Sequence, residues 1–401
     1  MIAEYAKFAI EGLRDKGIRS LLTMVGIFIG IAAVVSLISL GQGLQDAVNA
    51  QFAQLGGDII FVSPGGSMFE VGGGSELTEK DVKVIERVVG VDLVAPATVK
   101  IAKVEYGNEV IYTYIVGVPM DEGLELFKQM EFFKIQEGRW PKKNDRYKAN
   151  VGYRIATGDV YDKPVALRDR IKIEGTTFEV VGNMQSVGNS QDDQNIYIPL
   201  DVTLDLFDID NYMVIYVKGK QGTDLSKVAE RIKKDLRKSR DVEEGEEDFA
   251  VETSESLMET ISSILDIITY IVVGVALISL IVGGVGIMNT MYTSVLERTR
   301  DIGVMKAIGA RNNDILTIFL VEAGVLGIIG GVIGCVIGIA MSKSVEYAIV
   351  MSGNPGLLQA HVSVELVVGA LAFSFIVGCL SGVLPAKQAA SLKPVDALRY
   401  E

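Results

Sequence analysis

The stretch GGVGIMNTMYTSVLERTRDIGVMKAIGARNNDIL, residues Gly283 to Leu316, decides how the chain is organised. It begins inside an apolar run, because no Asp, Glu, Lys or Arg occurs between Ile267 and Leu296. A helix of that length rises about 45 Å, whereas the hydrocarbon core of a bilayer is about 30 Å thick. The run is therefore long enough to cross a membrane, and the charged turn that follows it, residues 297–314, would lie close to the membrane surface.

The composition of the 401-residue chain indicates that apolar and charged segments are separated. Hydrophobic residues make up 49% and charged residues 22% of the chain, and the mean hydropathy is +0.33. Both cysteines, Cys335 and Cys379, lie in apolar runs, which excludes a disulfide framework. His361 is the only histidine, which excludes a Cys/His metal cluster. The apolar runs predict four transmembrane helices, at residues 20–42, 261–296 (with a stalk), 315–342 and 365–385.

The distribution of Lys and Arg predicts the orientation of these helices. Short segments that stay in the cytoplasm are enriched in basic residues. The N-terminal segment, the 297–314 turn and the tail at 386–401 together hold 11 Lys and Arg. The short 343–364 loop holds only Lys343. We therefore expect a multi-pass protein of the cell membrane, with both termini and the turn in the cytoplasm and the 343–364 loop outside. Residues 1–19 are expected to form an amphipathic helix at the inner surface.

Residues 43–260 separate the first two spans and are expected to form an extracytoplasmic α/β domain. Strand-like runs flank Gly107-Asn108, which predicts a hairpin. Thr78 and Asp81 match the capping pattern at the start of a helix, and residues 224–240 read as a charged amphipathic helix. A glycine-rich turn is expected at residues 65–74. Between residues 46 and 266 there are 40 acidic and 26 basic residues, which argues against a nucleic-acid binder.

Three separated segments resemble one protein family. ERTRDIGVMKAIGAR in the charged turn resembles the cytoplasmic loop of the FtsX-like, or MacB-type, ABC transporter permeases. RSLLTMVGIFIGIAAVVS, from Arg19 to Ser36, is similar to the first membrane helix of that family, and LPAKQAASLKPVDALRYE, from Leu384 to Glu401, to its C-terminus. The resemblance implies a MacB-like periplasmic core for residues 43–260 and contact between the turn and a nucleotide-binding subunit.

The turn can be interpreted in two ways. On residue chemistry alone it could serve only as a basic anchor on the cytoplasmic side. The resemblance instead implies ATPase coupling, in which Ile302, Met305 and Ile308 present one apolar face, Gly303 and Gly309 permit close approach and end a short helix, and the charges set the register. The residues expected to couple to the ATPase are Glu297, Arg298, Arg300, Asp301, Ile302, Gly303, Met305, Lys306, Ile308, Gly309 and Arg311.

The membrane spans contain one acid and several regularly spaced glycines. Glu322 lies in the third span, where interhelical hydrogen bonding is the favoured interpretation and a proton relay the alternative. Glycines at four-residue spacing allow helices to approach closely in lipid. They are Gly26 and Gly30 in the first span, Gly330, Gly334 and Gly338 in the third, and Gly378 and Gly382 in the fourth.

No catalytic motif is recognisable. The chain has no GxxxxGK[ST] phosphate loop and no GxSxG elbow, so we expect no enzyme, no metal and no cofactor in this chain. The resemblance implies a homodimeric permease working with an ABC ATPase that binds ATP and Mg²⁺, and with an extracytoplasmic accessory or substrate protein. Such a permease would move a hydrophobic or amphipathic substrate by mechanotransmission. The alternative is an FtsX-type signal relay that regulates a cell-envelope enzyme.

Overall fold

The computed structural model describes residues 17–65, 76–354 and 358–398. The chain forms two compact units. The helical unit comprises residues 1–45, 263–349 and 358–401, and the α/β unit comprises residues 46–262 and 350–357. Most of the helix expected at residues 1–19 and of the glycine-rich turn expected at 65–74 lies outside the described residues.

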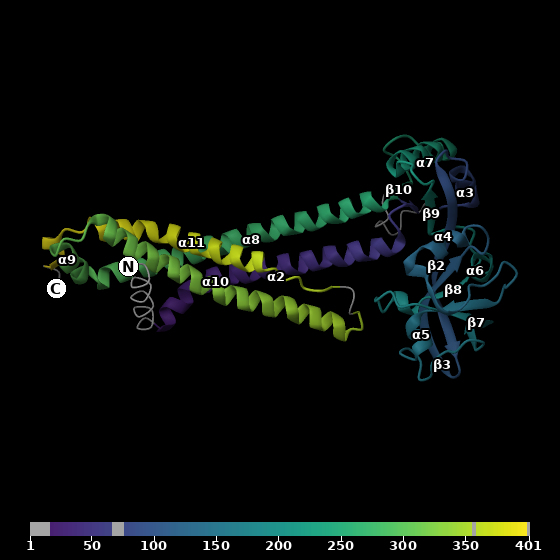
Figure 1. Cartoon of the computed structure of the whole chain (residues 1–401), viewed down its shortest axis with the longest axis horizontal. Coiled ribbons are helices and arrows are strands. Elements are labelled where there is room, and N and C mark those ends of the chain that lie inside the picture. Colours follow the sequence, from purple (N-terminus) through teal and green to yellow (C-terminus); the bar gives the residue numbers. More distant parts are fainter. Residues whose placement is uncertain (1–16, 66–75, 355–357, 399–401) are drawn as a thin grey trace. The chain divides into compact units, whose positions relative to one another are not determined.

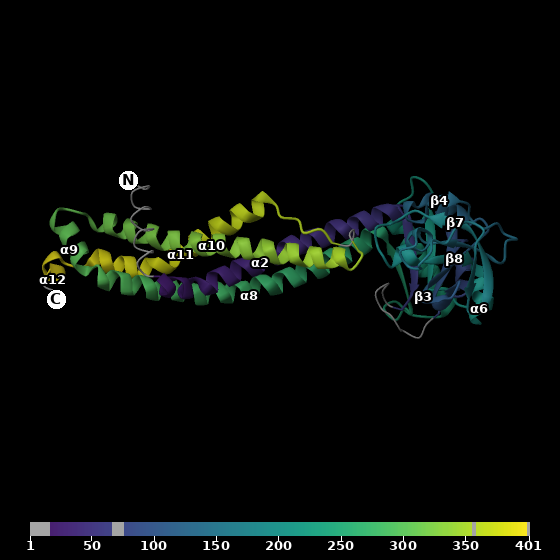
Figure 2. The same ribbon diagram turned by 90° about the horizontal axis from the view of Figure 1, so that it is seen from below.

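Four long helices run lengthwise through the helical unit (Figures 1 and 2). Each is long and apolar enough to cross a membrane. They are α2 (Gly17–Leu55), α8 (Ser254–Glu297), α10 (Asn312–Met351) and α11 (Val364–Ser391). The α/β unit lies between the first and second of these helices in the sequence. This confirms the expected fold class, four membrane-spanning helices with an inserted α/β domain.

All four helices extend beyond the boundaries expected from hydropathy. The first continues past residue 42 to Leu55, and the third continues past residue 342 to Met351. The fourth passes through Pro385 and ends at Ser391. Hydropathy locates the lipid-facing part of a helix, but the hydrogen bonds of the backbone continue until a turn residue or a cap stops them. The 44-residue α8, for example, would rise about 66 Å, twice what a span requires.

Small residues allow the four helices to pack closely. A Cβ added at Gly283 of α8 would lie 2.6 Å from the backbone nitrogen of Ile27 in α2. A Cβ added at Gly334 of α10 would lie 2.8 Å from the Phe28 carbonyl oxygen, again in α2. At these positions a side chain would separate the helices. Large side chains fill the remaining core, including Ile27, Ile31, Ile287, Met291 and Phe319.

The α/β unit is built on a continuous, twisted sheet. Its strand order is β10-β1-β9-β2-β3-β8-β5-β7-β4, and β6 pairs with β2 and β7. The strands are β1 (Ile59–Pro64), β2 (Val91–Tyr106), β3 (Glu109–Val118), β4 (Ile135–Gly138), β5 (Lys148–Val151), β6 (Arg170–Ile173), β7 (Thr176–Met184), β8 (Ile196–Pro199), β9 (Val214–Gly219) and β10 (Phe249–Thr253). The 16-residue β2 pairs with β9 along its first half and with β3 along its second, so it joins two lobes of the sheet.

Short helices complete the two units. In the α/β unit they are α3 (Glu79–Ile85), α4 (Leu124–Gln129), α5 (Tyr153–Thr157), α6 (Leu200–Phe207) and α7 (Leu225–Arg240); in the helical unit they are α9 (Thr299–Ala307) and α12 (Pro394–Leu398). Helices α3 and α7 contribute buried side chains to one core with β1 and β9, including Val82, Ile85, Val228 and Ile232.

Two local predictions for the α/β unit are confirmed. The Thr78 backbone N–H donates to Asp81 at 2.8 Å, which completes the capping box of α3. Gly107, with φ of 61°, forms the turn of the β2–β3 hairpin. The acidic run at residues 243–248 is exposed over its first four residues. The Glu247 side chain is 11% exposed and pairs with Lys233 and Arg237, because the basic helix α7 lies beside the run.

Candidate functional site

Helix α9 forms the charged turn between α8 and α10. One residue, Arg298, separates it from the end of α8, and the backbone N–H groups of Arg298 and Ile302 donate to the carbonyl oxygens of Ser294 and Arg298. Gly309, with φ of 107°, lies just beyond its last turn. The Ala310 N–H donates back to the Met305 carbonyl at 3.0 Å, as in a glycine-terminated helix. The sequence therefore makes a short helix with a defined end at Gly309, as expected, whereas Gly303 lies inside the helix.

One side of α9 is buried against the helical unit. Thr299, Ile302 and Gly303 are buried, and Ile302 is completely inaccessible. Met305 packs against the same core. The expectation that Ile302, Met305 and Ile308 form one exposed apolar face is therefore wrong. Their three-residue spacing identified apolar positions, but the helix carries apolar residues on both sides.

The other side of α9 is an exposed stripe that mixes charged and apolar side chains. Its apolar members include Val304, 47% exposed, and Ile308, 82% exposed. The side chains of Arg300, Asp301 and Arg311 form no ion pair with the residues that the structure describes. We define the exposed stripe as Arg300, Asp301, Val304, Ala307 and Ile308, which recur at three- and four-residue steps along α9, together with the exposed residues Glu297 just before the helix and Arg311 just after it. Val304 and Ala307 were missed from the sequence, although their spacing from Arg300 and Arg311 could have identified them.

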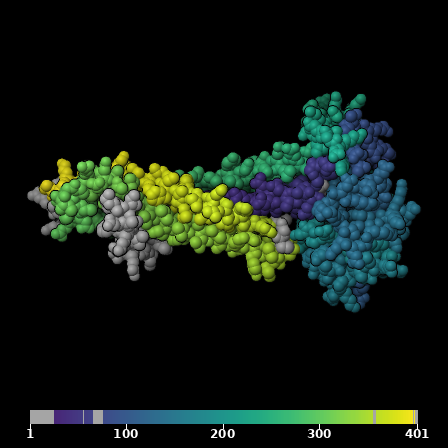
Figure 3. All heavy atoms as spheres, in the orientation of Figure 1, coloured from purple at the N-terminus to yellow at the C-terminus, as the bar shows by residue number. Residues whose placement is uncertain are grey.

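Lys306 attaches α9 to the end of α11. Its Nζ donates to the carbonyl oxygens of Ala390 at 2.5 Å and Leu392 at 2.7 Å. These carbonyls lie at the C-terminal end of α11, where a lysine satisfies unpaired acceptors and interacts favourably with the helix dipole. Helix α12 also contacts α9, and in Figure 3 the green turn lies beside the yellow C-terminal segment. Lys306 therefore contacts its own chain.

Arg298 and Glu322 attach the end of α8 to α10. The Arg298 Nη1 lies 3.3 Å from Glu322 Oε2, and the Ser294 hydroxyl donates to Oε1 at 3.4 Å. The Glu322 side chain is 6% exposed and that of Arg298 19%. The structure thus shows the interhelical hydrogen bonding favoured for Glu322 and supplies a partner, Arg298, that the sequence had assigned to ATPase coupling.

Six of the seven glycines singled out from the sequence lie at contacts between helices. Gly26 and Gly30 face α8, and Gly334 and Gly338 face α2. Gly378 and Gly382 face Ala323 of α10. Gly330 is buried on α10. Within the described residues, no group of three or more His, Cys, Asp or Glu side chains is placed to hold a metal ion.

Comparison with known proteins agrees with this architecture. The model of the MacB-like periplasmic core domain matches residues 20–235, and that of the FtsX-like permease C-terminal matches residues 273–394. An uncharacterized ABC transporter permease of Methanocaldococcus jannaschii is 42% identical over 98% of this chain and 97% of its own length.

In two further comparisons, the aligned region covers only part of the other protein or only part of this chain. A macrolide export ATP-binding/permease protein MacB of Aeromonas hydrophila is 30% identical over 99% of this chain. The aligned region spans 61% of that protein's length. The crystal structure of the periplasmic region of MacB from Actinobacillus actinomycetemcomitans covers 54% of this chain and 97% of its own, with a TM-score of 0.44 and 15% identity. The two family models and the full-length relative show that the chain belongs to the MacB-like, FtsX-like family of ABC transporter permeases.

Proposed function

We propose that the chain is a permease subunit that works by mechanotransmission. ATP hydrolysis by a partner ABC ATPase moves α9, and the helices carry that motion to the α/β unit, which exports or extracts a hydrophobic or amphipathic substrate. The observation that carries the proposal is the exposed stripe on a helix whose other side is fixed to the chain. A partner that contacts the stripe would move α9 together with α10 and α11, because Arg298 and Lys306 attach the turn to both.

The stripe has the chemistry of a docking surface. Arg300, Asp301 and Arg311 provide charges of both signs, and Val304 and Ile308 provide apolar area between them. Opposite charges on a partner would fix the orientation, while burial of the apolar side chains would supply affinity. An anchor on the cytoplasmic side requires only basic residues, so exposed Val304 and Ile308 favour docking.

The path of transmission would be α8. It is a single helix from Ser254, which belongs to the α/β unit, to Glu297, one residue before the Arg298–Glu322 pair. Its backbone hydrogen bonds are internal, so a helix of this kind resists axial compression better than a loop would. A displacement at the α9 end of α8 would therefore be transmitted along the helix to Ser254.

The energy source is expected in the partner subunit. Membership of the ABC permease family implies an ATPase partner, and the name of the Aeromonas relative joins ATP-binding and permease functions. We propose that this chain hydrolyses no ATP, since it contains no GxxxxGK[ST] sequence, and that ATP and Mg²⁺ are bound by the ATPase. A homodimer in the cell membrane, with both termini and α9 in the cytoplasm, would present two stripes to two ATPase subunits.

The test is charge reversal within the stripe. Arg300→Glu should leave the permease folded and inserted, because Arg300 is exposed and makes no ion pair with the described residues. It should weaken association with the cognate ABC ATPase about tenfold, since an interfacial charge would face a partner of the wrong sign. Association is measured by co-purification from detergent, and coupling by the ATPase activity of the reconstituted complex.

Lys234→Glu is the matched control. Lys234 lies on α7, is exposed and makes no ion pair within the described part of the chain. The control should associate and couple like the unmodified permease. If Arg300→Glu and a Val304→Asp variant both couple as well as Lys234→Glu, the stripe does not dock the ATPase and the anchor interpretation of the turn stands.

A further inference from the structure

The end of α10 belongs to the α/β unit, although it lies far from that unit in the sequence. The boundary between the two compact units falls inside α10, so that residues 350–354 group with the α/β unit and the preceding part of the helix with the helical unit. Two other helices cross the same boundary, since α2 leads into β1 and α8 follows β10. Helix α10 is therefore a third attachment of the α/β unit.

A hydrogen bond joins the segment after α10 to the loop between β7 and β8, residues 185–195. The Oδ1 of Asn354 accepts from the Ser190 backbone N–H at 2.8 Å. Ser190 is 7% exposed. A backbone N–H at such a buried position requires a partner other than bulk water, and Asn354 supplies it.

Gly353 fits closely against the same loop. Its φ is 85°, and its N–H donates to the Val350 carbonyl at 3.0 Å. A Cβ added at Gly353 would lie 2.8 Å from the Ser190 Oγ and 3.6 Å from the Arg154 Nη1. The positive φ and the lack of space both require glycine here. The Arg154 guanidinium is thus close to the C-terminal end of α10, where a cation interacts favourably with the helix dipole.

The β7–β8 loop is firmly fixed to the sheet. The buried Asp193 carboxylate accepts from the Ser186 hydroxyl at 2.7 Å and from the Val187 N–H at 2.8 Å. The Thr113 hydroxyl of β3 donates to the Gln194 carbonyl at 2.8 Å. A displacement at Ser190 would therefore move the strands and not merely deform the loop.

This third attachment lies on a different lobe from the other two. Strands β1 and β10, which α2 and α8 join, are neighbours at one end of the sheet. Strands β7 and β8 lie beyond β2 in the second lobe. Two adjacent helices alone would leave the α/β unit free to rotate about them. An attachment on the second lobe opposes that rotation.

The contact is small enough to be reversible. It consists of the Asn354–Ser190 hydrogen bond and the close approach of Gly353 to the same residue. One hydrogen bond contributes little net free energy, because water replaces the partner when the contact opens. By contrast, α2 and α8 are continuous with the strands and cannot be released.

We propose that residues 350–354 form a strap that restricts rotation of the α/β unit when it is closed on Ser190 and frees the unit when it opens. A movement of α10 would then set the freedom of the α/β unit directly, by a path separate from α8. The strap is a property of this chain alone and requires no ATPase. A failure of this proposal is therefore distinguishable from a failure of ATPase coupling.

The first measurement is disulfide crosslinking of the closed strap. Both native cysteines are replaced by alanine, and Ser190→Cys is combined with Gly353→Cys. A Cβ at Gly353 would lie 3.8 Å from the Ser190 Cβ, and disulfides have a mean separation of about 3.8 Å. Mild oxidation of the full chain in nanodiscs should therefore form the bond, which mass spectrometry detects. Ser190→Cys with Lys343→Cys is the matched control and should not crosslink, because Lys343 lies about 12 Å before the end of α10 along the helix axis.

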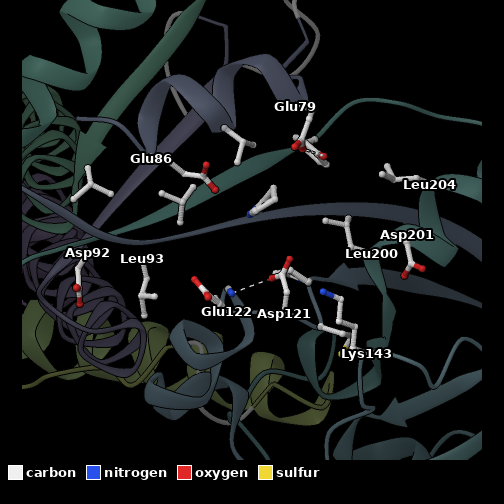
Figure 4. Close-up of a pocket in the computed structure, with 18 of the residues that line it drawn as sticks. Glu79, Glu86, Asp92, Leu93, Asp121, Glu122, Lys143, Leu200, Asp201 and Leu204 are labelled. Atoms are coloured by element: carbon white, nitrogen blue, oxygen red, sulfur yellow. Dashed lines mark hydrogen bonds between the residues drawn. The ribbon is translucent and has the colours of Figure 1, made fainter. Parts of the chain in front are cut away.

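The second measurement is the distance between two spin labels, one on each unit, in the same full chain without ATPase. Lys143→Cys carries the label of the α/β unit. Lys143 is exposed, and in Figure 4 it lies across a cavity of about 920 Å³ from Glu86 of α3, so the label has room. Val364→Cys, at the start of α11, carries the label of the helical unit and is 78% exposed.

Opening the strap should broaden the distribution of distances between the labels. Gly353→Val with Asn354→Ala opens it, because the valine side chain would collide with Ser190 and the hydrogen-bond acceptor is lost. Asn354→Ala alone removes only the acceptor and should broaden the distribution less. Met351→Ala is the control, since Met351 is 70% exposed on the last turn of α10, and it should leave the width unchanged. Fluorescence of the buried Trp140 shows that the α/β unit is folded in each variant.

Two results would overturn the proposal. The first is the absence of a disulfide between positions 190 and 353, or equal crosslinking of the control pair, which would show that the strap does not close on Ser190. The second is a distribution of equal width in the strap variants and in Met351→Ala, which would show that the contact does not restrict the α/β unit.

Discussion

Arg298 and Glu322 are the residues through which the end of α8 is joined to α10. A carboxylate that is 6% exposed is costly to ionise unless a cation and hydrogen-bond donors surround it, and Arg298 and Ser294 supply both. Arg298 therefore stabilises the joint from which the exposed stripe extends, even though its place in the sequence suggested a contact with the ATPase.

Removing one partner of this pair should lower the free energy of unfolding more than replacing both partners. Arg298→Ala leaves the Glu322 carboxylate buried without its cation, which should destabilise the fold by about 3 kcal/mol. Combining Arg298→Met with Glu322→Leu should restore much of that loss, because no charge then remains buried. The measurement is the thermal unfolding midpoint in detergent. Arg300→Ala, two residues away on the exposed stripe, is the control, and an equal midpoint for Arg298→Ala and Arg300→Ala would contradict the prediction.

A second ion pair makes the stability of the α/β unit depend on pH. Both Asp81 oxygens accept from the Arg240 guanidinium, at 3.0 and 2.9 Å. Burial raises the pKa of Asp81, but Arg240 and the Thr78 N–H and hydroxyl more than offset burial and hold the pKa below its ordinary value of 3.8. A lowered pKa means that ionised Asp81 stabilises the fold above pH 3.8, and that this contribution is lost as the pH falls through the lower, folded-state pKa.

Asp81→Asn should therefore destabilise the α/β unit at neutral pH by about 1.5–3 kcal/mol, the usual range for hydrogen bonds to a charged group. The difference in free energy of unfolding between the variant and the unmodified chain should become smaller below pH 4. Fluorescence of Trp140, the only tryptophan and a buried residue of the α/β unit, reports this unfolding in the full chain. Asp235→Asn on α7 is the control. A difference that stays constant from pH 7 to pH 3 would show that the charge of Asp81 is not the cause.

At the scale of the helices, packing depends on where a glycine lies along a helix. Gly283 and Gly274 both belong to α8, yet a Cβ at Gly283 would lie 2.6 Å from Ile27, whereas a Cβ at Gly274 would meet nothing within 4 Å. The same contrast holds on α11 between Gly378, where a Cβ would lie 2.5 Å from the Ala323 oxygen, and Gly369, where the space is open.

Alanine at these positions should have opposite effects. Gly283→Ala and Gly378→Ala should lower the thermal unfolding midpoint, because each forces two helices apart. Gly274→Ala and Gly369→Ala should keep or raise it, since alanine favours a helix by up to about 1 kcal/mol over glycine. The midpoints are compared in one detergent, and the pairs control each other. If all four variants shift by the same amount, helix propensity and not interhelical contact determines the effect.

The glycines also show how far the sequence determines these elements. Four-residue spacing identified the faces of α2, α10 and α11 that pack. It did not identify the partner helix, nor Gly283, because the distance between two helices is set by residues far apart in the sequence. For α9 the sequence located the helix and its end at Gly309, but the burial of Ile302 and the attachment of Lys306 to α11 depend on the surrounding helices. In the α/β unit, the hairpin and the capping box are local and were predicted, while the path of β2 through both lobes is not local and was missed.

At the scale of the whole molecule, the function depends on which side of the membrane each segment occupies. Coupling requires α9 in the cytoplasm, and the proposed transmission requires the α/β unit outside. The placement of Lys and Arg favours this orientation: α9 and its flanks hold Arg298, Arg300, Lys306 and Arg311, whereas between residues 343 and 364 there is only Lys343, which pairs with Glu346.

Cysteine labelling tests the orientation. Both native cysteines lie in α10 and α11 and can be replaced by alanine to give a background without thiols. Gln221→Cys reports on the α/β unit and Asn312→Cys on the start of α10, and both positions are exposed. In intact cells a membrane-impermeant maleimide should label position 221 and leave position 312 unlabelled. Both should react once the membrane is permeabilised, which shows that each thiol is accessible. Labelling of position 312 in intact cells would place α9 outside, where no ATPase that uses cytoplasmic ATP could reach the exposed stripe.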